Sequence, residues 1–180
     1  MSEIKSTVDI VLEKTKHLTL SEDEKRAQKK KEARQNLAGL LQKYQDEVLD
    51  IHQLKDNLNK LREFSDFIDT HALVSEILNR IELDKDNRSF MVILDDICQA
   101  DLDGLKAVLS EYQKTLDMRR DQRSDHITEK LSCHYHVSGS AVLPNLTAED
   151  GWAAELQTIY AEYNRLLSRE KVAMLKGRPL

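Results

Sequence analysis

The sequence VSGSAVLPN, residues 137–145, decides the fold because it separates two long runs of helical periodicity within residues 101–177. On both sides of it, apolar side chains recur three and four residues apart, which is the spacing of a coiled-coil seam. A short connection makes consecutive helices antiparallel, so we predict a long antiparallel helical hairpin over 101–177. The positions are Leu102, Leu105, Leu109, Tyr112, Leu116, Ile127 and Leu131 before the segment, and Trp152, Leu156, Ile159, Tyr163 and Leu166 after it.

Two arginines interrupt the first seam, because Arg119 and Arg123 fall on the register of the apolar side chains. Polar groups at such positions can fix the pairing of helices at a cost in stability, or they can mark where a helix faces water. Antiparallel pairing is expected to place Trp152 opposite residues 127–135. It also puts Glu170 in register to meet one of the arginines. The run Thr147-Ala148-Glu149-Asp150 is expected to supply the N-cap of the second helix.

The N-terminal part predicts three shorter helical segments. Residues 4–17 carry apolar side chains at helical spacing, and capping-box patterns begin at Ser21 and Asp50. The helix after Ser21 is polar from Glu22 to Asn36 and has an apolar stripe only afterwards, up to Val48, so its first half is expected to project or to be covered. One apolar face is expected on the helix after Asp50: Ile51, Leu54, Leu58, Leu61 and Phe64.

Two more helices are expected before the hairpin. Thr70 is predicted to cap a helix that runs to about Ile81, and residues 84–87 form a polar connection. Residues 90–98 are so apolar that they indicate a buried helix, with a strand over 90–94 as the alternative. We therefore expect an N-terminal helical region over residues 1–66 and a helical bundle over 67–180, which contains the hairpin with its first helix opening at Asp101.

Composition favours an all-α protein with an elongated, coiled-coil-like bundle. The 180 residues include only 5 Gly and 2 Pro, whereas average usage gives about 20 together, and 33% of the side chains are charged. The net charge of −5 gives no general attraction to nucleic acid or anionic membranes. The chain has two cysteines, too few for a disulfide framework, and residues 1–10 contain no apolar core of signal-peptide length. We therefore expect a cytoplasmic protein. No apolar run is long enough to span a membrane.

A basic run over residues 25–34 is the first candidate binding site. Such a run can bind phosphate or an acidic partner, but it can equally be a solvated helix face buffered by Glu22, Asp23, Glu24 and Glu32. No aromatic residue within it could stack on bases. The candidate patch consists of Lys25, Arg26, Lys29, Lys30, Lys31 and Arg34.

The sequence CHYH, residues 133–136, is the candidate metal site. Zinc prefers Cys and His ligands and takes three or four of them from protein. On a continuing helix, Cys133 and His136 share a face while His134 points elsewhere, so only two groups bind one ion easily. A frayed helix end is the alternative interpretation, and no cofactor is predicted.

The sequence contains part of one enzyme motif and no complete one. The run Asp95-Asp96-Ile97-Cys98-Gln99-Ala100-Asp101 resembles the first aspartate-rich motif of isoprenyl diphosphate synthases, in which carboxylates hold magnesium. The second motif of that family is missing. The sequence contains no GxSxG, HExxH or P-loop pattern, so we do not predict an enzyme.

The opening residues 1–7 and the segment 139–145 resemble small all-helical bacterial proteins that carry no established activity. That resemblance implies an all-helical fold and transfers no function. The sequence predicts a non-enzymatic interaction or assembly protein that forms a homodimer and binds a protein partner. Two alternatives stay open: binding of nucleic acid or an acidic partner through residues 25–34, and metal binding through Cys133, His134 and His136.

Overall fold

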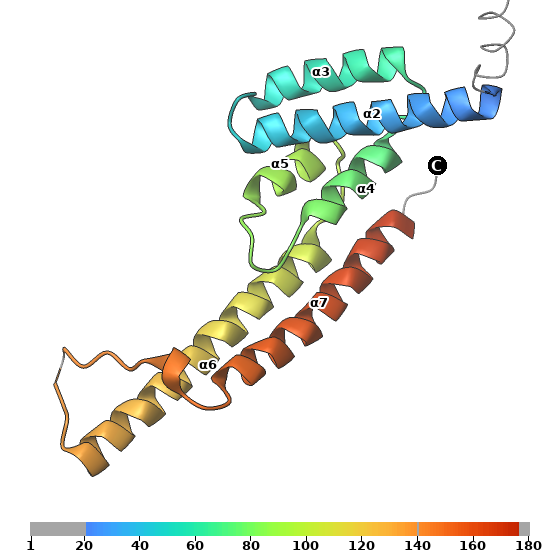
Figure 1. Cartoon of the computed structure of the whole chain (residues 1–180). Coiled ribbons are helices and arrows are strands. Elements are labelled where there is room, and N and C mark those ends of the chain that lie inside the picture. The colour runs from blue at the N-terminus through green and yellow to red at the C-terminus, as the bar shows by residue number, and fades with distance from the viewer. Residues whose placement is uncertain (1–20, 140, 177–180) are drawn as a thin grey trace, which may run out of the picture. The chain divides into compact units, whose positions relative to one another are not determined.

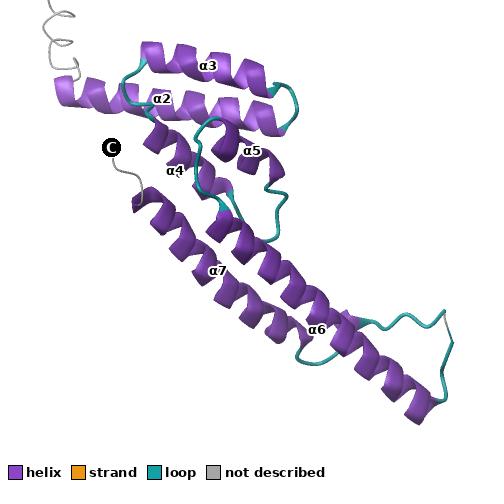
Figure 2. Cartoon of the chain, turned by 180° about the vertical axis from the view of Figure 1, so that it is seen from behind, coloured by secondary structure: helices purple, strands orange, loops and turns teal. Residues whose placement is uncertain are grey.

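The computed structural model describes residues 21–139 and 141–176, and every regular element in these ranges is a helix (Figures 1 and 2). The prediction of an all-α protein is confirmed. No helix within the described ranges is both long and apolar enough to cross a membrane. The short helix expected over residues 4–17 lies outside the described residues.

The chain divides into two compact units, the first ending at Leu73 and the second beginning at Val74. This division falls inside α4 (Thr70–Arg80). Each unit is built on a pair of long helices, α2 and α3 in the first and α6 and α7 in the second.

In the first unit, α2 (Glu22–Gln45) and α3 (Ile51–Phe64) both begin with the predicted capping boxes. Ser21 accepts the N–H of Glu24, and the backbone N–H of Ser21 donates to the Glu24 carboxylate, which lowers the pKa of Glu24. Because α2 ends at Gln45, the stripe predicted to reach Val48 stops earlier and Val48 is exposed. The buried side chains of the pair are Ala33, Leu37, Leu41, Leu54 and Leu58.

The start of α4 corrects one predicted cap. The carboxylate of Asp69 accepts the N–H of Ala72 at 2.6 Å, while Thr70 is already the first helical residue. Both residue types favour the N-cap, so the sequence pattern does not choose between neighbours. The cap is therefore Asp69 and not Thr70.

The connection from α4 to α5 (Arg88–Asp96) is closed by a buried side-chain amide. Asn87 donates to the carbonyl of Glu82 at 2.7 Å and accepts the N–H of the same residue at 3.2 Å. Both polar ends of the amide are satisfied, which removes the cost of burying it. The α5 segment is a helix, so the alternative of a strand over 90–94 is wrong, and Phe90, Ile93 and Leu94 are buried.

In the second unit, α6 (Asp103–Tyr135) and α7 (Trp152–Lys176) lie side by side, as both views show (Figures 1 and 2). Two predicted helix starts were wrong by a few residues. α6 begins at Asp103, whose N–H donates to the Asp101 side chain, and not at Asp101. Thr147 does not cap α7, because residues Leu146–Ala148 form the short 3-10 helix η2 and the carboxamide of Asn145 accepts its N–H and hydroxyl.

The register between α6 and α7 follows from contacts along their length. Near the middle, the Thr115 and Tyr163 hydroxyls are 2.8 Å apart, and the Tyr112 and Tyr163 ring centroids are 5.6 Å apart. The Tyr112 hydroxyl also donates to Asp84 at 2.6 Å, and burial followed by this bond raises the pKa of Tyr112. These links tie α6 both to α7 and to the connection before α5.

The seam arginines meet the beginning of α7. Arg123 donates to the backbone carbonyl of Asp150 at 2.8 Å, and Arg119 lies 3.8 Å from the carboxylate of Glu155. Trp152 lies in sequence between Asp150 and Glu155, so the beginning of α7 lies beside the part of α6 that carries Arg119 and Arg123. The pairing of Trp152 with residues 127–135 stays a prediction. Glu170, expected to meet an arginine, instead lies against Gly104.

Candidate binding groove on the α2–α3 pair

The helices α2 and α3 run antiparallel in the first unit (Figures 1 and 2). A groove lies along one side of this pair. It consists of two clefts of about 680 Å³ and 370 Å³ that share Asn36, Leu61 and Phe64. Each helix contributes side chains spaced three, four or seven residues apart, so each set forms one stripe. The α2 stripe is Lys25, Lys29, Asn36, Leu40 and Lys43, and the α3 stripe is Asn57, Lys60, Leu61 and Phe64.

Phe64 lies where the two clefts meet, and 88% of its surface is exposed. It was predicted to share the buried face of α3 with Leu54 and Leu58, and that prediction was wrong. Ten residues separate Leu54 from Phe64, so at 3.6 residues per turn the two side chains point about 80° apart around the helix. Leu61, seven positions after Leu54, points only about 20° away from it, and its side chain is half-buried and lines both clefts.

The wider cleft contains charges of both signs. Glu22 pairs with Lys25 at 2.8 Å, and the Arg26 guanidinium lies 5.9 Å from the centre of the Phe67 ring. These contacts engage two of its three basic side chains within the protein. The charged side chains that line this cleft are Glu22, Asp23, Lys25, Arg26, Lys29, Glu32 and Asp66.

The narrower cleft has a single sign of charge. Lys43 and Lys60 are its only charged lining residues, and neither forms an ion pair within the described part of the chain. Its other polar lining comes from the side-chain amides of Gln35, Asn36 and Asn57. A Cβ atom added at Gly39 would have no atom within 4 Å other than those of its own helix backbone and its two neighbours, so α2 is open to an approaching molecule here.

The structure distributes the predicted basic patch around α2. Lys25, Arg26 and Lys29 line the wider cleft, whereas Lys30, Lys31 and Arg34 are exposed and line neither cleft. The six residues therefore do not form one surface, because consecutive positions on a helix are about 100° apart. Lys43 and Lys60, which lie outside the basic run, are groove residues that the sequence analysis missed.

The three candidate metal ligands lie at the end of α6. Cys133 and His134 are exposed in its last turn, and His136 follows with a left-handed backbone, φ 55°. The helix thus ends at Tyr135, and the helical face that Cys133 and His136 were expected to share does not continue. Within residues 21–139 and 141–176, no three His, Cys, Asp or Glu side chains converge as metal ligands would.

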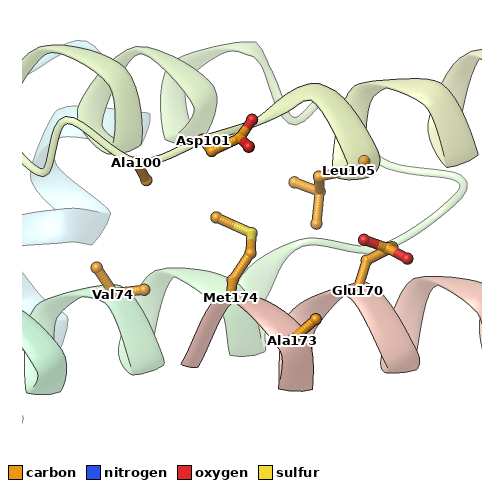
Figure 3. A pocket seen from close by; sticks show the side chains of 8 residues that line it. Val74, Ala100, Asp101, Leu105, Glu170, Ala173 and Met174 are labelled. Carbon is orange, nitrogen blue, oxygen red and sulfur yellow. The ribbon is translucent and has the colours of Figure 1, made fainter. Parts of the chain in front are cut away.

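A separate cavity of about 270 Å³ lies in the second unit where the start of α6 meets the end of α7 (Figure 3). Figure 3 shows Met174 extending into it and the Asp101 and Glu170 carboxylates at its rim. Neither Lys nor Arg is among its lining residues. Calcium takes six to eight oxygen ligands, so two carboxylates supply only a small part of a calcium site. The remaining lining residues are Val74, Ala100, Gly104, Leu105 and Ala173.

No protein-family model, curated protein sequence or solved structure matches this chain. The residues that line the α2–α3 groove are therefore the basis for a proposed function.

Proposed function

We propose that this chain is a non-enzymatic interaction protein that binds a partner protein along the α2–α3 groove. The observation that carries the proposal is the exposure of Phe64 at the junction of the two clefts. Complete burial of a phenylalanine side chain contributes about 1.5–3 kcal/mol, so a partner that covers Phe64 gains a large share of its binding energy there. Interfaces are also enriched in aromatic anchors of this kind.

The charges of the groove favour a protein over nucleic acid. Binding of nucleic acid depends mainly on cations that neutralise phosphates. Here the wider cleft contains four carboxylates beside its three basic side chains, and Lys25 is already paired with one of them. Lys25, Arg26 and Lys29 lie in this wider cleft, so phosphates bound to them would also lie close to its carboxylates and be repelled.

A photo-crosslinking side chain at position 64 of the full chain tests the proposal. The matched control carries the same group at Leu143, which is 89% exposed but lies in the loop before α7. We expect a discrete protein adduct at position 64 that is absent at position 143 and is lost when Leu61 is replaced by Asp. Equal labelling at both positions contradicts the proposal. An adduct removed by nuclease supports the nucleic-acid alternative instead.

We also propose that α6 and α7 form a coiled-coil-like hairpin through which the chain pairs as a homodimer. Support comes from the apolar side chains left exposed where α6 ends, namely Tyr135 and Val137. Burial of apolar surface between two copies stabilises a dimer by about 25 cal/mol per Å². Sedimentation velocity over a range of concentrations should give the mass of two chains, and Tyr135→Ser with Val137→Ser should reduce it. A constant mass of one chain contradicts this part of the proposal.

A further inference from the structure

The groove also indicates what kind of partner it binds, an inference that rests on the proposed function. We propose that its occupant is an amphipathic α-helix with an acidic segment. Its apolar side chains lie on Leu40, Leu61 and Phe64, and its carboxylates lie against Lys43 and Lys60.

The form of the groove selects a helix. The backbone N–H and C=O groups inside α2 and α3 are bonded within each helix, so neither helix offers an edge to which a strand could add. A groove between two helices instead accepts the ridge of a third helix. From Lys25 to Lys43 the groove extends about 27 Å at 1.5 Å per residue, which matches a helix of about 18 residues.

The open backbone at Gly39 permits close approach of that helix. Gly39 lines the narrower cleft, and the space above it is free of other atoms to 4 Å. Because glycine has no side chain, a bulky apolar residue of the partner can rest against α2 here and reach the half-buried side chain of Leu40.

Charge complementarity gives the partner its acidic segment. Lys43 and Lys60 line the narrower cleft with no carboxylate among its lining residues and no ion pair within the described chain. The wider cleft has charges of both signs and therefore does not strongly favour a partner segment of either charge. A second copy of this groove is disfavoured as the occupant, because a two-fold contact brings these lysines toward their own copies.

A designed peptide of 18 residues tests the inference with the full chain. The peptide carries Leu at helical positions i, i+4, i+7 and i+11 and Glu on the flanking positions, with a fluorescent label for polarisation titration. Two control peptides have the same composition in scrambled order, or Lys in place of every Glu. We expect saturable one-to-one binding of the first peptide, and at least about tenfold weaker binding of both controls.

Charge-reversal variants locate the binding site. Lys43→Glu with Lys60→Glu should weaken the acidic peptide by about tenfold or more and should strengthen the Lys peptide. The matched control is Lys30→Glu with Lys31→Glu, which changes the same charge on exposed positions of α2 outside the groove and should leave binding within about twofold.

Two apolar variants complete the test. Phe64→Ala should weaken binding about tenfold by removing the anchor, and Gly39→Leu should weaken it by filling the open space. Circular dichroism melting of each variant establishes that the chain is still folded. Gly39→Leu also replaces glycine by a strong helix former, so loss of binding cannot be attributed to loss of the helix.

The outcomes separate the inference from the proposed function. Equal binding of the Glu and Lys peptides, or equal loss in the control variant, overturns the acidic helix. If the acidic peptide binds only after residues 1–17 are removed, the chain's own N-terminal segment occupies the groove. That result also overturns the inference of an acidic partner helix. If a protein is cross-linked at position 64 while no acidic peptide binds, the proposed function stands and the inference fails.

Discussion

The α2–α3 pair and the α6–α7 pair are both antiparallel helix pairs, yet their aromatic side chains differ in exposure to water. In the second pair, Tyr112 and Tyr163 pack with their ring centroids 5.6 Å apart, and Tyr112 is 4% exposed. In the first, Phe64 is 88% exposed beside an open groove. Three-to-four spacing places residues on one face of a helix, but the neighbouring elements decide whether that face is covered.

The largest expected effect compares one covered residue with one uncovered residue. Leu167 is 1% exposed, so Leu167→Ala removes buried contacts and leaves a cavity, and we expect a loss of about 2–5 kcal/mol in the free energy of unfolding. Phe64→Ala should change the same quantity by less than about 0.5 kcal/mol, because its side chain is surrounded by water. Urea unfolding followed by circular dichroism measures both. Equal losses would show that Phe64 is covered in solution.

An intermediate effect concerns the polar links of the second pair. Tyr112→Phe removes the 2.6 Å bond to Asp84 and should lower the free energy of unfolding by about 1–2 kcal/mol at neutral pH. The ring remains, so its packing against Tyr163 is retained.

The difference between the Tyr112→Phe variant and the native chain should depend on pH. Burial and the bond to Asp84 raise the pKa of Tyr112 in the folded protein above the value of about 10 that it has when unfolded. Its contribution is therefore fully present below pH 10 and is lost as pH rises further, because the unfolded chain releases the proton first. Unfolding measured at pH 7, 9, 10 and 11 should show a constant difference up to pH 9 and a shrinking one beyond. A difference that grows above pH 10 would contradict the buried hydrogen bond.

The smallest effect tests how closely α6 and α7 approach. Gly104→Ala adds a helix-favouring residue worth about 0.5–1 kcal/mol, but its new methyl group collides with the Glu170 carboxylate. That carboxylate is the end of a flexible side chain and can move aside, so the net change should be smaller than this gain. In a Glu170→Ala background the full gain should appear. Thermal melting of the four combinations measures the difference, and identical gains in both backgrounds would contradict the close approach.

Local patterns predicted the parts of this fold that depend on few residues. The capping boxes at Ser21 and Asp50 were predicted correctly because each needs only two side chains three positions apart. Residues 90–98 were expected to form a buried helix, and the observed helix α5 spans Arg88–Asp96. The start of α7 was misplaced because a 3-10 turn over Leu146–Ala148 uses the same polar residue types as a cap.

The groove was missed for a related physical reason. Leu61 and Phe64 were assigned to the buried face of α3 from their spacing, although the stripe that contains Phe64 rotates away from Leu54. A signal was present in the sequence, because Asn57, Lys60, Leu61 and Phe64 form a second, mixed stripe on α3. Recognising it as the lining of a groove required knowledge that α2 leaves that side open.

The bond from Arg123 to the carbonyl of Asp150 has a practical consequence. Every amino acid supplies the same main-chain oxygen, so this hydrogen bond at the base of the loop does not depend on which side chain stands at position 150. The strongly exposed Leu143 lies in the loop, seven residues before Asp150. A foreign epitope inserted after Leu143 should therefore be displayed in the loop between α6 and η2, with the α6–α7 pair left intact.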